Sequence, residues 1–210
     1  MSIQAVVFDM DGVLIDAREW HYEALNRALG HFGMTISRFD HLVTYDGLPT
    51  RAKLEMLSRE RDLPRRLHGF LNELKQNYTM ELVWQHCRPV FQHEYALSRL
   101  RGEGYHLAVA SNSVRQSIVE MMSKSALLPH LDFVLSNEDV THGKPDPEIY
   151  VKAIEQLGLV PHEVLVVEDN EKGIKAATLA GAHVLPVQEP ADVTFEAIVA
   201  EIAHIEGGLL

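Results

Sequence analysis

The chain has a single cysteine and no long apolar run, and each shortage excludes a class of protein. Cys87 has no second cysteine to pair with among the 210 residues, so an internal disulfide is impossible, which fits a reducing compartment. No apolar stretch approaches the ~18 residues that a membrane-spanning helix requires, and the opening residues lack the basic region of a secretory signal. We expect a cytoplasmic protein with no anchor and no membrane partner.

Basic residues are also in short supply. The chain has 19 lysine and arginine residues against 30 aspartate and glutamate residues, a net charge of −11 with histidine neutral. This balance repels nucleic acid and anionic lipid, and the densest basic stretch, Arg59–Arg66, also holds Glu60 and Asp62. None of the 12 histidines has a partner at the spacing of a zinc motif. We therefore expect no nucleic-acid partner and no zinc site.

What the chain does have is an alternation of short apolar runs and amphipathic helical patterns. Valine-rich runs, typical of strands buried on both faces, predict five strands: Ile3–Phe8, His106–Ala110, Phe133–Leu135, Val164–Val167 and His183–Val187. Helical spacing between them marks three helix faces: Ile118, Met121 and Met122; Ile149, Ala153, Ile154 and Leu157; and Gly173–Ala180. Strands alternating with helices predict an α/β fold with a doubly wound parallel sheet.

The stretch from Asp16 to Gln85 breaks this rhythm because it contains no convincing strand. Helical spacing marks three groups of residues: Ala17, His21, Leu25, Ala28 and Phe32, with Gly33 as a stop; Leu54 and Leu57; and Phe70, Leu71, Leu74 and Tyr78. About 70 residues is too long for an ordinary strand-to-helix loop. We predict an inserted helical domain over 16–85 within an α/β core formed by 1–15 and 86–210. The connections near Ile15 and Gln85–Pro89 would be hinges.

Polar residues follow four of the predicted strands: Asp9 to Gly12, Ser111 to Ser113, Ser136 to Asp139, and Glu168 to Asn170. In an open parallel sheet, ligands bind at the carboxyl ends of the strands, where such residues converge. A single acid after a strand is more often the N-cap of the next helix. Two acidic pairs with a serine turn between them favour a binding site instead.

The acids suggest a magnesium site. Residues two apart on an extended chain point to the same side, so Asp9 and Asp11 could face one site, with Gly12 relieving the turn after them. Crowded carboxylates repel one another, and one of them has a raised pKa unless a cation lies between them. With Glu168 and Asp169, up to four hard oxygen ligands would surround one point, which suits Mg²⁺.

Two features indicate an anion beside these acids. If the turn Ser111–Ser113 opens a helix, its backbone N–H groups and the positive end of the helix dipole would face a phosphate. Pro145 restricts Lys144 to an extended conformation, and Asp146 and Pro147 have the pattern of an N-cap and a first helical residue. A lysine beside a proline turn is usually a solvated charge, but the acids here require a cation.

At these residues the sequence resembles the haloacid dehalogenase superfamily of aspartate-nucleophile phosphotransferases. The motifs are DMDGVLID from Asp9, ASNS from Ala110, GKPDPEIY from Gly143 and VVEDNEKGI from Val166. They occur in the family's order and span nearly all of the predicted core. The resemblance implies a Rossmann-like core, and the helical insert resembles the small cap of β-phosphoglucomutase and phosphoglycolate phosphatase relatives.

The resemblance also implies a role for each matched residue. Asp9 would be the nucleophile that forms an aspartyl-phosphate, and Asp11 would protonate the leaving alkoxide and later activate water. The metal, Mg²⁺, would be held by the Asp9 carboxylate, the Asp11 carbonyl and Asp169, with Glu168 acting through water. Three groups would bind the phosphoryl oxygens: Lys144, Ser111 and the Asn112 N–H.

Asp11 also distinguishes branches of the superfamily. Its dehalogenases lack an acid at this position because halide leaves without a proton, and its phosphonoacetaldehyde-cleaving members use a cap lysine instead. Lys53 lies in the predicted cap, and with Asp11 present we interpret it as an ordinary solvated helix charge. We therefore expect a phosphate monoester as substrate.

Three cap residues bear on whether the phosphoryl group goes to water or to a sugar. His21 resembles the mutase histidine that restrains the general acid, and a helix-face histidine packed beside Trp20 is an equal alternative. Arg51 and Lys75 are each out of register with the mutase residues, and a shift of one residue turns a helical side chain by about 100°. They remain candidates for substrate binding, with a solvated surface role as the alternative.

The expected function is therefore a Mg²⁺-dependent phosphatase of a small phosphorylated metabolite, with a sugar phosphate favoured and a phosphomutase as the alternative. A phospho-aspartate signalling receiver is disfavoured, since receivers have ~120 residues, no helical insert and their aspartate on a later strand. An inert relative would have lost one of the acids.

The oligomeric state is left as a monomer or a weak homodimer. The segment Arg88–His93 has no assigned role, and the tail Ile198–Leu210 is left open between a helix and a free end.

Overall fold

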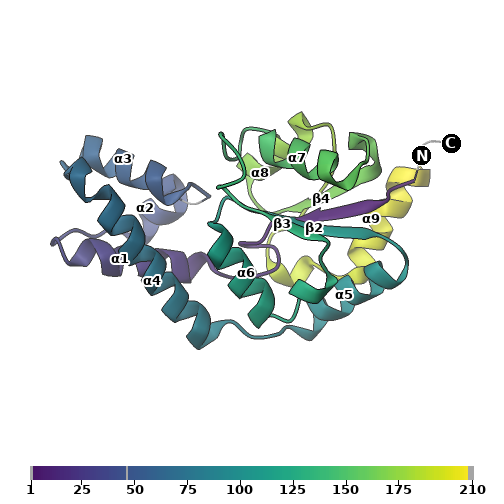
Figure 1. The fold of residues 1–210 in the computed structure, drawn as a ribbon, viewed down its shortest axis with the longest axis horizontal. Coiled ribbons are helices and arrows are strands. Elements are labelled where there is room, and N and C mark those ends of the chain that lie inside the picture. Colours follow the sequence, from purple (N-terminus) through teal and green to yellow (C-terminus); the bar gives the residue numbers. More distant parts are fainter. Residues whose placement is uncertain (1, 46, 208–210) are drawn as a thin grey trace. The chain divides into compact units, whose positions relative to one another are not determined.

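The computed structural model describes residues 2–45 and 47–207, which form two compact units (Figure 1). One unit, the core, comprises Met1–Asp16 and Arg88–Leu210, and the other, the cap, is the insert Ala17–Cys87. These boundaries lie one or two residues beyond the expected connections. The expected edge at Gln85 falls inside helix α4 (His68–His86), which continues for one more residue.

The core contains a five-stranded sheet in which each described strand runs parallel to its neighbours. Its strands are β1 (Ala5–Phe8), β2 (His106–Ala110), β3 (Phe133–Leu135), β4 (Val164–Glu168) and β5 (His183–Pro186). Their order is β3-β2-β1-β4-β5, so the order reverses beside β1. The predicted strand positions agree to within two residues at each end. The carboxyl ends of β1, β2 and β4 therefore meet at the switch point where ligands bind in such sheets.

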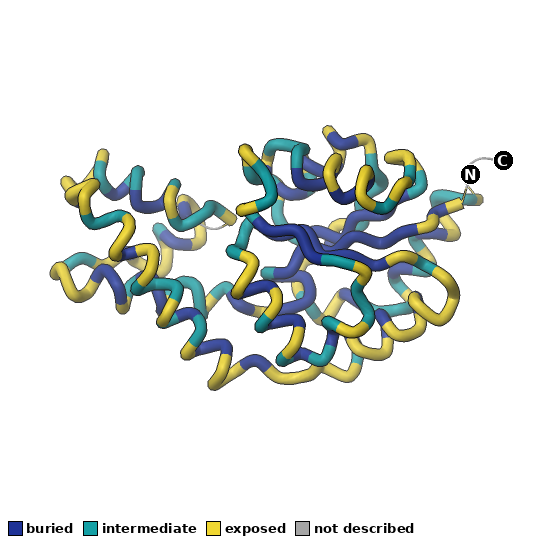
Figure 2. The backbone as a smooth tube through the Cα atoms, in the orientation of Figure 1, coloured by how far each residue is buried: buried dark blue, intermediate teal, exposed yellow. Residues whose placement is uncertain are grey.

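Helices cover both faces of this sheet, which confirms the predicted doubly wound α/β fold (Figure 1). Helices α7 (Glu148–Leu157) and α8 (Glu171–Leu179) lie on one face, and α5 (Phe91–Gly102), α6 (Arg115–Lys124) and α9 (Phe195–Gly207) lie on the other. Alternate strand residues face the two layers, so both layers exclude water, and β1 and β4 are completely buried (Figure 2). The predicted apolar faces of α6 and α7 are buried except at Leu157, which is partly buried.

The described residues of the cap form helices joined by turns and loops, with no strand among them. Its helices are α1 (Arg18–Gly30), the short turn α2 (Arg38–Asp40), α3 (Thr50–Glu60) and α4. Leu25, Ala28 and Leu29 of α1 pack into its apolar centre. Phe32 was predicted on this face but lies beyond the end of α1 and is 40% exposed. Gly33, at φ +68°, ends the helix through a bond from the Met34 N–H to the Leu29 carbonyl at 3.2 Å, as such glycines commonly do.

The structure describes two segments that the sequence left open; in the first, Arg88–Val90 is not helical and α5 begins at Phe91. The segment Arg88–His93 leads into α5, where Gln92 Nε2 donates to the carbonyls of Ala191 and Val193 at 2.8 and 3.0 Å. His93 Nε2 lies 2.8 Å from the Pro190 carbonyl, so the start of α5 is tied to the loop after β5. Residues 198–207 of the tail lie in α9, with Ile198 and Ile202 buried against the core. Residues 208–210 lie outside the described residues. Five single turns complete the described structure: His41–Tyr45, Arg65–Leu67, Leu128–His130, Pro161–Glu163 and Pro190–Asp192.

Among the described residues, no helix combines the length and the apolar character that a membrane span requires.

Candidate active site

Asp9 lies at the switch point, directly after β1. Its N–H donates to the Val167 carbonyl at 3.0 Å, and its side chain is nearly buried. The chain then turns sharply through Gly12, which adopts φ +90°. A Cβ on Gly12 would lie 2.1 Å from Asp169 Oδ2. The glycine is therefore needed twice, for its backbone conformation and for the close approach of the Asp169 carboxylate.

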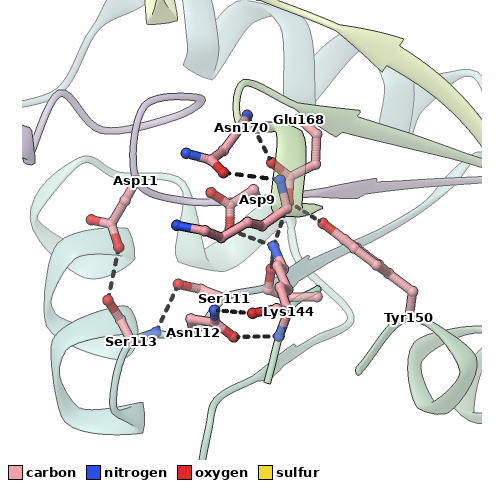
Figure 3. Close-up of polar contacts among 11 residues, drawn as sticks. Asp9, Asp11, Ser111, Asn112, Ser113, Lys144, Tyr150, Glu168 and Asn170 are labelled. Carbon is pink, nitrogen blue, oxygen red and sulfur yellow. Dashed lines mark hydrogen bonds and ion pairs between the residues drawn. The ribbon is translucent and has the colours of Figure 1, made fainter. Parts of the chain in front are cut away.

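Lys144 joins the acids of two strands at the centre of this site (Figure 3). Its Nζ donates to Asp9 Oδ1 at 2.7 Å, to Glu168 Oε1 at 2.6 Å and to the Ala110 carbonyl at 2.8 Å. The ammonium side chain is only 5% exposed, so these three acceptors replace the water that it would otherwise bind. The structure thus brings the predicted cation and the predicted nucleophile into direct contact.

The backbone of Lys144 is held by Asn112, which follows β2. Asn112 Oδ1 accepts the Lys144 N–H at 3.0 Å, and Asn112 Nδ2 donates to the Lys144 carbonyl at 3.4 Å. A Cβ on the preceding Gly143 would lie 2.7 Å from Asn112 Oδ1, so this approach also depends on a glycine. The side chain of Asn112 therefore positions the lysine. Its N–H, which the sequence assigned to phosphate, is not part of this contact.

Glu168, the last residue of β4, is almost completely buried. Its Oε1 accepts from the Tyr150 hydroxyl at 2.6 Å in addition to Lys144, and the lysine Nζ lies 4.7 Å from the centre of the Tyr150 ring. A Cβ on Gly173 would lie 1.8 Å from the same Oε1. Gly173 thus leaves the space that the Glu168 side chain fills beside α8.

Burial and charge act in opposite directions on these groups. Burial raises the pKa of Asp9 well above its usual value; Lys144 opposes this, while Glu168 and Asp11 add to it. Burial alone would lower the pKa of Lys144, but the Asp9 and Glu168 carboxylates outweigh it and the pKa is raised. Lys144 therefore remains charged at neutral pH. When both buried carboxylates are ionised, their two negative charges exceed the single positive charge of Lys144, and a further cation would offset the difference.

The carboxylates of Asp9, Glu168 and Asp169 are grouped as a metal ion requires. One oxygen from each lies within 4.8 Å of the others, and the set is formed by the residues after β1 and at the end of β4. Carboxylate oxygens are the donors that Mg²⁺ and Ca²⁺ prefer, whereas structural zinc sites are formed by Cys and His. The donor set therefore fits a hard divalent cation. Asp169, which is partly exposed, is the most accessible of the three.

Four acidic side chains were expected to surround one point, but only three of them are grouped, and Asp11 is the exception. Its carboxylate is not in this group; its Oδ2 instead accepts the Ser113 hydroxyl at 2.7 Å (Figure 3). Asp9 and Asp11 do not lie on one extended segment, because the backbone already turns at Met10, whose carbonyl accepts the N–H groups of Leu14 and Ile15. The role implied for the Asp11 carbonyl is a separate prediction and does not depend on its side chain.

The serine turn was predicted to open a helix, and this prediction is wrong. Helix α6 begins at Arg115, and the Arg115 N–H donates to Glu138 Oε2 at 2.7 Å. Ser111 is buried, its N–H donates to the Leu135 carbonyl at 3.0 Å, and its Oγ accepts the Ser113 N–H at 3.1 Å. The turn is therefore shaped by its own hydroxyl and by β3, with a glutamate at the helix terminus.

The cap residues singled out from the sequence divide into three environments. Lys75 of α4 and His21 of α1 meet, with 3.2 Å between Lys75 Nζ and His21 Nδ1, so His21 accepts and carries its proton on Nε2. Arg51, near the start of α3, is exposed. Lys53 was expected to be solvated but is only 7% exposed, because it lies on the same face of α3 as the buried Leu57, four residues on. The contact between His21 and Lys75 was not expected, since 54 residues separate them.

Sequence reasoning missed Tyr150, Ser113 and Gly173. Tyr150 stands in the GKPDPEIY segment, but nothing in the sequence indicated that its hydroxyl donates to Glu168. Ser113 was part of the serine turn, yet its contact with Asp11 joins residues 102 apart in sequence. Gly173 had been counted only as part of a helix.

Comparison with known proteins places the chain in a family. A family model described as haloacid dehalogenase-like hydrolase matches residues 6–187. A phosphorylated carbohydrates phosphatase from Thermotoga maritima is 31% identical over 182 residues, covering 85% of this chain and 82% of that protein. Pyrophosphatase PpaX from Bacillus mycoides is 28% identical over 200 residues, covering 89% and 84%.

A solved structure shares the whole fold. The β-phosphoglucomutase from Clostridium difficile has a TM-score of 0.82 and 21% identity, covering 98% of this chain and 99% of that one. At this identity the likeness concerns the fold alone. The predicted resemblance and the prediction of an enzyme are confirmed by the family match over most of the chain and by the named phosphatases among its relatives. The chain belongs to the haloacid dehalogenase-like hydrolase family.

Proposed function

We propose that this protein is a Mg²⁺-dependent phosphatase that hydrolyses a small phosphorylated carbohydrate through an aspartyl-phosphate on Asp9. The observation that carries the proposal is the 2.7 Å contact between Lys144 Nζ and Asp9 Oδ1 beside the oxygens of Glu168 and Asp169. A buried carboxylate next to an ammonium and a cation site can approach an anionic phosphate without net repulsion. The relative named as a phosphorylated carbohydrates phosphatase supports this choice of substrate class.

The reaction has two steps. In the first, an Asp9 carboxylate oxygen forms a bond to phosphorus as the bond from phosphorus to the sugar oxygen breaks, and Asp11 gives its proton to the leaving alkoxide. In the second, water attacks the same phosphorus, Asp11 takes the water proton, and the bond to Asp9 breaks to release inorganic phosphate. Lys144 and the Ser111 hydroxyl would hold the phosphoryl oxygens throughout.

The metal would be held by the Asp9 carboxylate, the Asp11 carbonyl and Asp169. A divalent cation supplies positive charge that offsets the developing charge on the transferred group. The chain's own contribution is to keep Asp169 close to the Gly12 turn, where a Cβ could not fit. Glu168 would act mainly through Lys144, because the ammonium and the Tyr150 hydroxyl both donate to its Oε1.

The test is a phosphate-release screen with Mg²⁺ over sugar phosphates, phosphoglycolate, nucleotides and pyrophosphate. We expect turnover of at least one sugar phosphate, and acid quenching should trap radioactive phosphate on the protein. Asp9→Asn should abolish both signals with the circular dichroism spectrum unchanged, and Asp62→Asn, an exposed cap residue, should change neither. Residual turnover by Asp9→Asn above roughly a tenth of wild type would contradict a nucleophilic role for Asp9.

A phosphomutase is the second candidate, and the contact between His21 and Lys75 favours it. The sequence resemblance gives His21 the position of the mutase histidine that restrains the general acid, and Lys75 donates to that same ring. A mutase would interconvert hexose phosphates only in the presence of a catalytic bisphosphate. Release of free phosphate from every substrate, with no interconversion, would exclude this alternative. Substrate-binding roles for His21, Lys75 and Arg51 belong to either candidate.

A further inference from the structure

Ser113 links two groups of the candidate active site that come from different strands. Its hydroxyl contacts Asp11 Oδ2 at 2.7 Å, and its N–H donates to Ser111 Oγ at 3.1 Å (Figure 3). All three residues belong to the core, and Ser113 is partly buried. The proposed reaction uses Asp11 and Ser111 but gives Ser113 no role.

The side-chain contact constrains how Asp11 can act. When Asp11 is ionised its carboxylate can only accept, so the Ser113 hydroxyl must donate to Oδ2. A carboxylate otherwise rotates easily about its terminal bond, and a charge-assisted hydrogen bond to one oxygen opposes that rotation. With Oδ2 held, the orientation of the whole carboxylate that exchanges protons with the leaving group and with water is fixed.

We propose that Ser113 is the positioning residue of the general acid and base Asp11. This inference rests on the proposed function, since it requires Asp11 to transfer protons. General acid–base catalysis contributes about 10²–10⁴-fold to a rate, and a misaligned carboxylate loses part of that contribution. The loss should appear where a proton must reach the leaving group, and not where the leaving group departs without one.

The backbone contact separates this role from phosphate binding. Because the Ser113 N–H remains when the side chain is shortened, Ser113→Ala keeps the bond to Ser111 Oγ and removes only the bond to Asp11. Inhibition by inorganic phosphate should therefore be unchanged in Ser113→Ala. The maximal rate, not the binding of the phosphoryl group, should fall. A residue that merely supported the fold of the turn would weaken both.

The experiment measures phosphoenzyme formation by rapid acid quenching with two esters: a sugar phosphate that the wild type hydrolyses, and p-nitrophenyl phosphate, whose phenolate leaves without a proton. Ser113→Ala should be about 10-fold slower with the sugar phosphate and within about twofold of wild type with the phenyl ester. Ser113→Thr, which keeps a hydroxyl, should recover most of the rate. Ser125→Ala is the matched control, because the Ser125 hydroxyl donates only to the carbonyls of Met121 and Met122 at the end of α6.

A double-mutant cycle with Asp11→Asn completes the test. If Ser113 acts through Asp11, adding Ser113→Ala to Asp11→Asn should slow phosphoenzyme formation no further. Equal slowing of both esters by Ser113→Ala, or an additive loss in the double variant, would overturn the positioning role. An unchanged sugar phosphate rate in Ser113→Ala would also overturn it. If Asp11→Asn itself reacts as fast as wild type, the proposed function fails at Asp11, and that result is distinct from the others.

Discussion

The core and the cap both contain oppositely charged pairs, but in opposite surroundings. In the core, Lys144 pairs with Asp9 and Glu168, and the exposed fractions of the three side chains are 5%, 11% and 1%. In the cap, Arg38 pairs with Glu19 at 2.7 Å, and their side chains are 66% and 48% exposed. The distances are alike, so the difference lies in the water that remains around each pair.

This difference in hydration distinguishes the buried charges of the candidate active site from the exposed charges on the surface of the cap. A charge without water depends entirely on its partners, since leaving it unpaired costs several kcal/mol. A pair on the surface can exchange its partner for water at little cost, typically less than about 1 kcal/mol. Substitutions in the core should therefore change both stability and chemistry, while comparable substitutions in the cap should change little. Four predictions test this contrast.

The largest effect should follow from Lys144→Met. The substitution keeps an unbranched side chain but leaves Asp9 and Glu168 buried without their ammonium, which we expect to lower the free energy of unfolding by about 3–5 kcal/mol. Activity should fall about 10³-fold, because the phosphoryl oxygens also lose a positive charge. Urea unfolding in the presence of EDTA and the phosphate-release assay measure the two effects.

Arg38→Met is the matched control in the cap. It removes a cation whose partner, Glu19, is half-exposed, so the free energy of unfolding should change by less than about 0.5 kcal/mol. Similar losses of stability for Arg38→Met and Lys144→Met would contradict the contrast between the two units.

Glycines give the second prediction. In Gly173→Ala the new methyl would lie 1.8 Å from Glu168 Oε1, so the buried carboxylate must move away from Lys144; we expect a loss of about 3 kcal/mol. In Gly69→Ala, within α4 of the cap, no atom lies within 4 Å of the new methyl, and we expect a gain of about 0.5–1 kcal/mol. Thermal unfolding of the two variants should shift in opposite directions. If Gly173→Ala leaves the unfolding temperature unchanged, the Glu168 side chain must be able to adopt a second position at no cost in stability.

The fold and the location of the candidate site could be predicted from the sequence, but the close contacts at its glycines could not. Strand positions were predictable because buried parallel strands are continuous apolar runs, and the ends of β1, β2 and β4 located the site. Lys144 could be assigned because a cluster of acids requires a cation. The contact between Gly173 and Glu168 could not be predicted, since it depends on how closely the short turn at 169–170 brings the first turn of α8 back to the Glu168 side chain.

Local turns limited the rest of the prediction. Asp11 was expected to face the metal beside Asp9, but one turn at Met10 directs its carboxylate to Ser113. In the cap, Lys53 was expected to be solvated because lysine usually is, yet its place on α3 buries it. The helical pattern of the cap predicted that it is helical, but the contact between His21 and Lys75 requires the packing of α1 against α4.

The third prediction concerns the hydroxyl of Tyr150. Tyr150→Phe keeps the buried ring beside Lys144 and removes one of the two donors to Glu168 Oε1. Glu168 lies beside the proposed ligands Asp9 and Asp169 and holds Lys144 against Asp9, so a less constrained Glu168 carboxylate should disturb the metal site and weaken Mg²⁺ binding about 10-fold. Isothermal titration calorimetry with Mg²⁺ alone measures this. Tyr22→Phe, whose hydroxyl bonds the Ile36 carbonyl in the cap, should leave the affinity unchanged; equal affinity in all three proteins would assign Tyr150 to packing only.

The fourth prediction, with the smallest expected effect, is that the free energy of unfolding depends on pH through one aspartate in each unit. In the core, partial burial disfavours the charged form of Asp139, but hydrogen bonds from Ser136 and the pair with Arg115 outweigh it and lower its pKa below 3.8. In the cap, hydrogen bonding with Ser37, followed by the pair with Arg61, lowers the pKa of Asp40.

A pKa lowered by folding adds stability that is present above the unfolded value of 3.8 and is lost as the pH falls through the folded value. The stability difference between wild type and Asp139→Asn should therefore be largest near pH 6, about 1 kcal/mol, and should shrink below pH 4. For Asp40→Asn the trend should have the same sign with a smaller amplitude, because Asp40 lies in water and its pair is screened by salt. Urea unfolding at pH 6, 4 and 3 compares them, and a difference that grows as the pH falls would show that these carboxylates are protonated in the folded protein before the unfolded one.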